Sequence, residues 1–197
     1  MKTSLFALFL FAPAAAFAQD ASAVQKLFEA GRYQQVVEAA QAEAPPAVRF
    51  TAAQSQLKLG AADQAREIYQ QLADMPEEDA WHFIGLSGQQ LLDNQLDAAE
   101  ASAKRAVALA GDLAEAHYQL GLVLAKKQDW REGAAEFDRV ADLNPSHAYA
   151  HYYGGLMHYR ANRPDRMANH FEQFLKLAPD APERPEVLQI MKTVRGR

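Results

Sequence analysis

The sequence contains no cysteine, only 10 glycines among 197 residues, and no apolar run after its first 20 residues that could span a bilayer. Without cysteine no disulfide can form, so stability must come from side-chain packing. The remaining composition is 49% hydrophobic and 23% charged, which is ordinary for a globular chain. Abundant alanine, glutamine, glutamate and leucine, with few β-branched runs, favour helix throughout.

Runs of basic residues are also missing. The chain carries 20 Lys and Arg against 25 Asp and Glu, a net charge of −5. Scattered basic residues on an acidic chain argue against nucleic acid or an anionic membrane surface as the principal partner.

The first residues have the pattern of a secretory signal peptide. Lys2 supplies the positive charge, Leu5–Ala12 form a short apolar segment, and Ala16-Phe17-Ala18 is a small-x-small cleavage motif. We therefore expect cleavage after Ala18 and no membrane insertion after it. Because no cysteine follows that could carry a lipid, the product should be periplasmic or secreted, and the sequence leaves these two locations open. Pro13 argues against the alternative of an N-terminal helix of the fold.

Four segments share one pattern at a constant interval. Those that start at Gln95, Asp129 and Arg163 are 34 residues apart, and a weaker one starts at Ala61. A fixed interval of this length indicates an array of supersecondary units. Each unit fits two amphipathic helices joined by a short polar turn, such as Gln128-Asp129.

The spaced residues resemble those of the tetratricopeptide repeat. One unit carries Leu120, Gly121, Gly133, Phe137 and Pro145, and the next carries Gly155, Phe171 and Pro179. This resemblance implies an all-α fold, a right-handed superhelical solenoid of antiparallel helix pairs with a C-terminal capping helix. The family is a general binding scaffold, so the resemblance implies protein or peptide as the partner.

The repeat interval gives the expected organisation of the chain. We predict a signal peptide at 1–18, an irregular first helix pair at 19–45, four repeats at 46–79, 80–113, 114–147 and 148–181, and a capping helix at 182–197. A cap is expected because a solenoid must cover its last apolar face. Ala65, Ala99 and Gly133 should lie at close helix contacts, and bulky Met167 at the equivalent place should be accommodated by Gly154.

The first helices of stacked repeats line a concave surface. The stripe that we expect to face this groove, and to bind the partner, consists of Phe50, Leu57, Trp81, Ile84, Leu91, Tyr118, Leu122, Tyr149, Tyr152, Leu156 and Tyr159. Exposed aromatic side chains are typical interface anchors. Lys58, Lys126 and Arg160 follow the stripe and form a basic edge that could hold carboxylates. The alternative is that the aromatics fill the inside of a tightly wound superhelix or pack on the cap.

Catalytic and metal chemistry finds little support in the sequence. His147, His151 and His158 lie near one another, but no carboxylate lies within the same helix to complete a metal site. Nucleophile motifs, a glycine-rich phosphate loop and HExxH are all missing. We therefore predict no enzyme, no metal and no cofactor.

Two functions stay open. The first is an exported adaptor that holds a peptide or a partner protein in its aromatic-rich groove. The alternative is a structural subunit of an envelope assembly, of the secretion, pilus or cytochrome-maturation type, that binds through its convex face or C-terminal helix. The sequence identifies neither the partner nor the oligomeric state.

Overall fold

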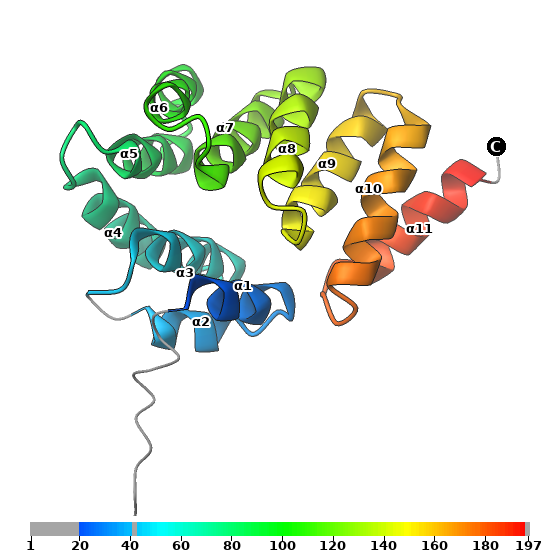
Figure 1. Ribbon diagram of the computed structural model, residues 1–197, viewed down its shortest axis with the longest axis horizontal. Helices are drawn as coiled ribbons and strands as arrows, with labels where there is room; N and C mark the ends of the chain where they lie inside the picture. Colours follow the sequence, from blue (N-terminus) through cyan, green and yellow to red (C-terminus); the bar gives the residue numbers. More distant parts are fainter. Residues whose placement is uncertain (1–19, 41–42, 196–197) are drawn as a thin grey trace, which may run out of the picture.

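A computed structural model describes residues 20–40 and 43–195, so the expected signal peptide lies outside the described residues. The described part is helical and contains no strand. Its helices are α1 (Ala21–Glu29), α2 (Tyr33–Ala39), α3 (Pro46–Lys58), α4 (Ala62–Ala73), α5 (Ala80–Leu92), α6 (Leu96–Leu109), α7 (Ala114–Lys127), α8 (Trp130–Leu143), α9 (Ala148–Arg160), α10 (Pro164–Leu177) and α11 (Arg184–Arg195). They pack as consecutive pairs along a curved array (Figure 1), which confirms the all-α solenoid. No helix in this range is long and apolar enough to cross a membrane.

The turn inside each pair uses a residue with a left-handed backbone. Gly60, Asn94, Gln128 and Asn162 have φ of 77°, 58°, 66° and 57°, and they recur at the interval of the repeat. Glycine and asparagine tolerate this conformation, which lets the chain reverse directly after a helix. The pairs α3–α4, α5–α6, α7–α8 and α9–α10 each lie within one of the four expected repeats.

Glycines on the first helices receive aromatic rings from the second helices. A Cβ atom on Gly121 would lie 2.8 Å from the ring of Phe137, and one on Gly155 would lie 2.4 Å from the ring of Phe171. Both rings are completely buried. The glycines thus allow the two helices of a pair to approach closely.

The space beside Gly154 is filled by a different residue from the one expected. Met167 is buried, but the ring next to Gly154 is that of His170, whose Nδ1 would lie 2.8 Å from a Cβ added there. The prediction that Gly154 makes room for Met167 is therefore wrong, because Gly154 makes room for His170.

The array curves until its two ends meet. The Glu29 carboxylate, at the end of α1, accepts a hydrogen bond of 3.0 Å from the backbone N–H of Ala148, at the start of α9. Lys58 Nζ, at the end of α3, lies 2.6 Å from a carboxylate oxygen of Glu183, just before α11. In Figure 1, α1 accordingly lies on the inner side of the array, between α3 and the lower ends of α9 and α10. These contacts close the concave side.

Helix α11 lies beside α10 at the end of the array (Figure 1). Its Val187 and Met191 are buried, while Leu188 is 47% exposed. The helix therefore covers part of the last apolar face and leaves one leucine in solvent.

Candidate functional site

The aromatic stripe predicted to be an exposed groove is mostly interior. Tyr149, Ile84, Tyr118, Phe50 and Tyr152 are 0%, 0%, 3%, 4% and 6% exposed. The expectation that Tyr118, Tyr149 and Tyr152 are partly exposed on one concave surface is wrong, because the closure of the ends covers them. Replacing these tyrosines by alanine would therefore test stability and not partner binding.

These buried rings and the half-buried ring of Tyr153 form a continuous aromatic interior, which consists of Phe28, Phe50, Tyr118, Tyr149, Tyr152 and Tyr153. Phe28 of α1 packs edge-on against Tyr149 of α9, with ring centroids 4.8 Å apart. Phe50 packs in the same way on Tyr118, at 6.1 Å. Edge-to-face pairs of this kind stabilise the fold beyond what the burial of their surface contributes. The ends of the array are thus joined by packing as well as by hydrogen bonds.

Hydroxyl groups of the aromatic interior are bound by the chain itself. The Tyr149 hydroxyl donates to Glu183 at 2.6 Å, and the Tyr152 hydroxyl donates to Glu186 at 2.9 Å. Burial, followed by the contact with Glu183, raises the pKa of Tyr149 far above its ordinary value. These hydroxyls therefore stay protonated, and each already donates its proton to a carboxylate of the same chain.

An open pocket lies above this interior, and part of the predicted groove lines it. We call it the leucine pocket, defined by Leu57 of α3, Leu91 and Leu92 of α5, and Leu122 of α7. Its volume is about 580 Å³, and Tyr69 and Tyr153 also line it. Of the predicted basic edge, Lys58 and Lys126 line the same pocket.

The other predicted groove residues lie elsewhere. Trp81 lines a separate cavity of about 640 Å³ together with Leu113 and the acidic residues Glu78, Asp79 and Asp112. The Arg160 guanidinium lies over the ring of Trp130, 5.9 Å from its centroid. Leu156 and Tyr159 of α9 are half-buried and do not line the leucine pocket. The predicted stripe is thus divided among the aromatic interior, the leucine pocket and the neighbouring surface.

The three histidines singled out in the sequence do not form one group. His147 is the N-cap of α9: its Nδ1 accepts a hydrogen bond of 3.2 Å from the backbone N–H of Ala150, and its ring stacks on Tyr118. Burial lowers the pKa of His147 to about 4, so the imidazole is neutral at pH 7.

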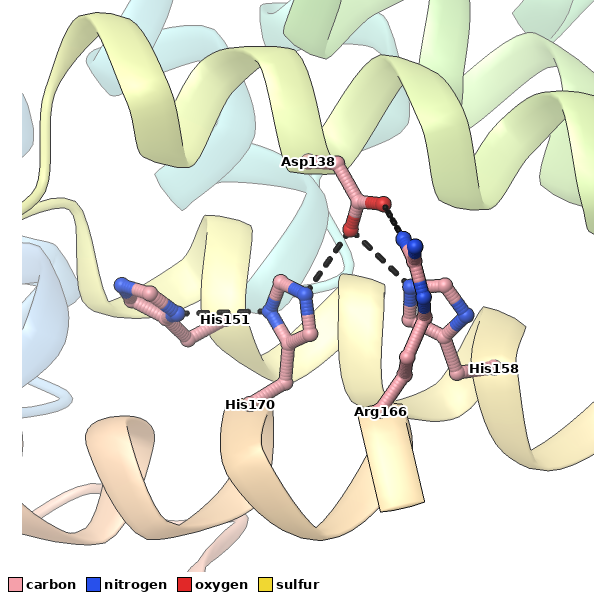
Figure 2. A network of polar contacts seen from close by, with 5 residues as sticks. All are labelled: Asp138, His151, His158, Arg166 and His170. Atoms are coloured by element: carbon pink, nitrogen blue, oxygen red, sulfur yellow. Dashed lines mark hydrogen bonds and ion pairs between the residues drawn. The ribbon is translucent and has the colours of Figure 1, made fainter. Parts of the chain in front are cut away.

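His151 and His158 instead meet residues that sequence reasoning missed. Figure 2 shows Asp138 of α8 pointing toward His158 of α9 and His170 of α10, with His151 on the other side of His170. The statement that α9 has no carboxylate of its own is correct, but the neighbouring helix supplies one. A signal was present in the sequence: His117 and Glu136 stand one repeat before His151 and His170. In the structure His117 Nδ1 lies 2.7 Å from a carboxylate oxygen of Glu136.

Comparison with known proteins shows what this chain is similar to. A sequence profile of the tetratricopeptide repeat matches residues 47–75. The structure of a thermophilic TPR protein of Thermus thermophilus superposes with a TM-score of 0.64, covering 91% of this chain and 100% of that one at 18% identity. The chain has the fold of a tetratricopeptide repeat protein. Among curated proteins no sequence matches it.

Two further solved structures are similar over most of the chain. YrrB, described as a TPR protein with an unusual peptide-binding site, has a TM-score of 0.51 at 18% identity and covers 90% of this chain and 89% of its own. MamA has a TM-score of 0.51 at 19% identity, covering 74% and 84%. At these identities the likeness shows the fold.

Proposed function

We propose that this TPR protein is a non-catalytic interaction scaffold. Its leucine pocket binds a segment of a partner protein that contains both acidic and apolar side chains. The observation that carries this proposal is the pocket itself, where leucines from α3, α5 and α7 gather beside Lys58 and Lys126. Apolar side chains of the partner would fill the leucine-lined volume, and carboxylates would meet the lysines. The peptide-binding site attributed to YrrB supports a peptide as the class of ligand.

The charge of the pocket favours an acidic ligand even though one lysine is already paired. Lys126 is exposed at the rim, while Lys58 holds Glu183 at 2.6 Å with 28% of its side chain exposed. A carboxylate of the partner would therefore meet Lys126 first and could then share Lys58 with Glu183.

Defined peptides test this function directly. Binding of short acidic peptides that contain leucine or phenylalanine should be measured by fluorescence anisotropy, against basic peptides with the same apolar residues. We expect Leu91→Asp and Leu122→Asp to weaken binding at least about tenfold, since each removes an apolar contact and adds a like charge. Lys126→Glu should shift the preference toward the basic peptides. The matched control is Leu109→Asp, which changes a leucine that is 41% exposed outside the pocket.

The alternative function uses a different surface. Leu188 on α11 is 47% exposed, so a structural role in an envelope assembly would place the partner there. Retention of binding by Leu91→Asp and Leu122→Asp, together with its loss in Leu188→Asp, would reject the leucine pocket in favour of α11.

The signal-like sequence at residues 1–18 supports export to the periplasm or beyond. Mass spectrometry of the protein recovered from the cell envelope should find a chain that begins at Gln19. An intact Met1 on that protein would reject export by this signal.

A further inference from the structure

Two imidazoles and a carboxylate from three consecutive helices converge at one point (Figure 2). Asp138 Oδ1 lies 2.9 Å from His158 Nε2 and 2.8 Å from His170 Nε2. One ligand atom from each of the three residues lies within 4.8 Å of the other two. We propose that Asp138, His158 and His170 form a binding site for a divalent transition metal of the zinc type, which would tie α8, α9 and α10 together.

The set of donor atoms selects the class of metal. Two imidazole nitrogens and one carboxylate oxygen are ligands that Zn²⁺ takes in three-residue sites, where water occupies the fourth position. Ca²⁺ and Mg²⁺ require mostly oxygen ligands, and Cu⁺ prefers sulfur, so neither class fits this site.

The distances between the ligands suit an ion with little rearrangement. Zinc bonds of about 2.0–2.2 Å in a tetrahedron place ligand atoms about 3.3 Å apart, so Asp138 and His170 would move outward by about half an ångström. The Asp138 and His170 side chains, 28% and 13% exposed, have solvent on one side and can make this movement. The completely buried His158 is the fixed ligand. Its Nδ1 is buried and has no hydrogen-bond partner, so a metal on Nε2 would leave the Nδ1 proton without an acceptor, which is a cost that the metal bonds must offset.

An outer shell of hydrogen bonds holds His170 in a ligand orientation. Its Nδ1 lies 3.3 Å from Nδ1 of His151, and His151 Nε2 lies 3.3 Å from the carbonyl oxygen of Pro145. A metal-binding histidine usually has such a partner on its second nitrogen, which fixes the ring. Gly154 provides the room, since a Cβ there would lie 2.8 Å from Nδ1 of His170.

The preceding repeat has the same outer shell without the site. His117 contacts Glu136 at 2.7 Å and the carbonyl oxygen of Gly111 at 3.1 Å, in the places of His151, His170 and Pro145. One repeat before His158 and Asp138 stand Leu124 and Lys104, which cannot ligate together. The three ligands therefore come together where the last two repeats meet, and the packing of the repeats does not require them.

Arg166 contacts the other oxygen of the carboxylate. Its Nη1 lies 3.1 Å from Asp138 Oδ2, and its side chain is 63% exposed. The guanidinium orients Asp138 so that Oδ1 faces the imidazoles, but its positive charge would repel the ion. Removal of this charge should strengthen binding.

Metal titration of the tag-free protein tests the site. Isothermal titration with Zn²⁺ should show one equivalent bound, and Co²⁺ should give visible absorption typical of four-coordinate nitrogen and oxygen ligation. His170→Gln and Asp138→Asn should weaken binding by at least about tenfold and abolish the Co²⁺ band. Arg166→Gln, which changes a side chain that is 63% exposed, should instead bind more tightly. His117→Gln is the matched control and should bind as the original chain does.

Two results would overturn the proposal. One is the failure of both the original chain and Arg166→Gln to bind Zn²⁺ or Co²⁺. The other is binding that persists unchanged in both His170→Gln and Asp138→Asn, which would place the ion elsewhere. Circular dichroism of each variant shows that it is folded. No partner peptide takes part, so this outcome is independent of the leucine pocket.

Discussion

At the scale of single residues, the glycines of the repeats fall into two kinds. A Cβ on Gly155 would lie 2.4 Å from the ring of Phe171, whereas one on Gly133 would find its nearest neighbour, Met157 Sδ, at 3.4 Å. The first glycine is required by close packing. The second leaves room for a methyl group, although the sequence pattern placed Gly133 at a close helix contact.

Alanine substitutions should separate these two kinds. Gly155→Ala should destabilise the protein by about 1–3 kcal/mol through overpacking. Gly133→Ala should be neutral or stabilise it by up to about 1 kcal/mol, because alanine favours helix. Urea denaturation of both variants measures the difference. Equal losses of stability would show that the assignment of the close contact is wrong.

His147 should make stability depend on pH in a defined window. Burial lowers its pKa to about 4 in the folded state, against about 6.5 in the unfolded chain, so folding favours the neutral ring. Its contribution is complete above about pH 6.5 and is lost as the pH falls toward 4, on the order of 3 kcal/mol in total.

His147→Asn provides the comparison, because asparagine can still cap α9. The difference in unfolding free energy between the original chain and this variant should shrink or change sign as the pH falls from 6.5 to 4. Taking the difference removes other groups, including Glu29, whose pKa is raised by burial and whose pH dependence has the opposite sign. A difference that is constant over this window would contradict the assignment.

At the scale of elements, the repeats differ in the conformational strain of the left-handed residue in the turn between their two helices. Gln128 has φ of 66°, in the place that glycine holds as Gly60 and asparagine as Asn94 and Asn162. The left-handed conformation costs a residue such as glutamine roughly 1–2 kcal/mol. The turn between α7 and α8 is therefore the most strained of the four.

Gln128→Gly should stabilise the protein by about 0.5–1 kcal/mol, which is the strain relieved less the greater freedom of glycine in the unfolded chain. Asn94→Gly is the control and should have a smaller effect, since asparagine tolerates this conformation. Thermal unfolding of the two variants gives the comparison. A loss of stability in Gln128→Gly would mean that its side chain makes a stabilising contact.

The sequence predicts elements well because their signals are local. The recurrence of Gly121, Phe137 and Pro145 predicts a TPR fold, which the structure confirms. The aromatic interior corresponds to the alternative that the sequence left open, that the aromatics fill the inside of a tightly wound superhelix. The sequence could not decide for it, because the winding depends on small rotations summed over the repeats until Glu29 reaches Ala148. The cluster of Asp138 with His170 was missed for a similar reason: its members come from three helices and have no spacing within any one of them.

At the scale of the whole molecule, Glu183 takes part in several of the contacts that join the two ends of the array. One of its oxygens binds Lys58 of α3, and the other accepts from Tyr149 of α9, both at 2.6 Å. Nearby, Pro182 packs against Gly31, whose added Cβ would lie 2.7 Å from it. The segment before α11 thus joins the first helices to the last repeat.

Glu183→Ala should loosen this closure. We expect a loss of about 1–3 kcal/mol in stability, because the buried Tyr149 hydroxyl loses its charged acceptor. Amides of α1 should exchange faster, and small-angle scattering should show a larger radius of gyration. The control is Glu186→Ala, which removes an acceptor of Tyr152 without touching α3. Identical exchange of α1 in both variants would show that Glu183 does not hold the ends together.

Closure also constrains how this protein can evolve. An open solenoid can gain or lose a unit, since each unit touches only its neighbours. Here the contact of Glu29 with Ala148 spans 119 residues, and that of Lys58 with Glu183 spans 125. Duplicating any one repeat between them would rotate α9 away from α1 and expose the rings of Phe28 and Tyr149 to water. The copy number is therefore fixed by the closing contacts, and lineages of this chain should diverge by substitution within four repeats and not by changing their number.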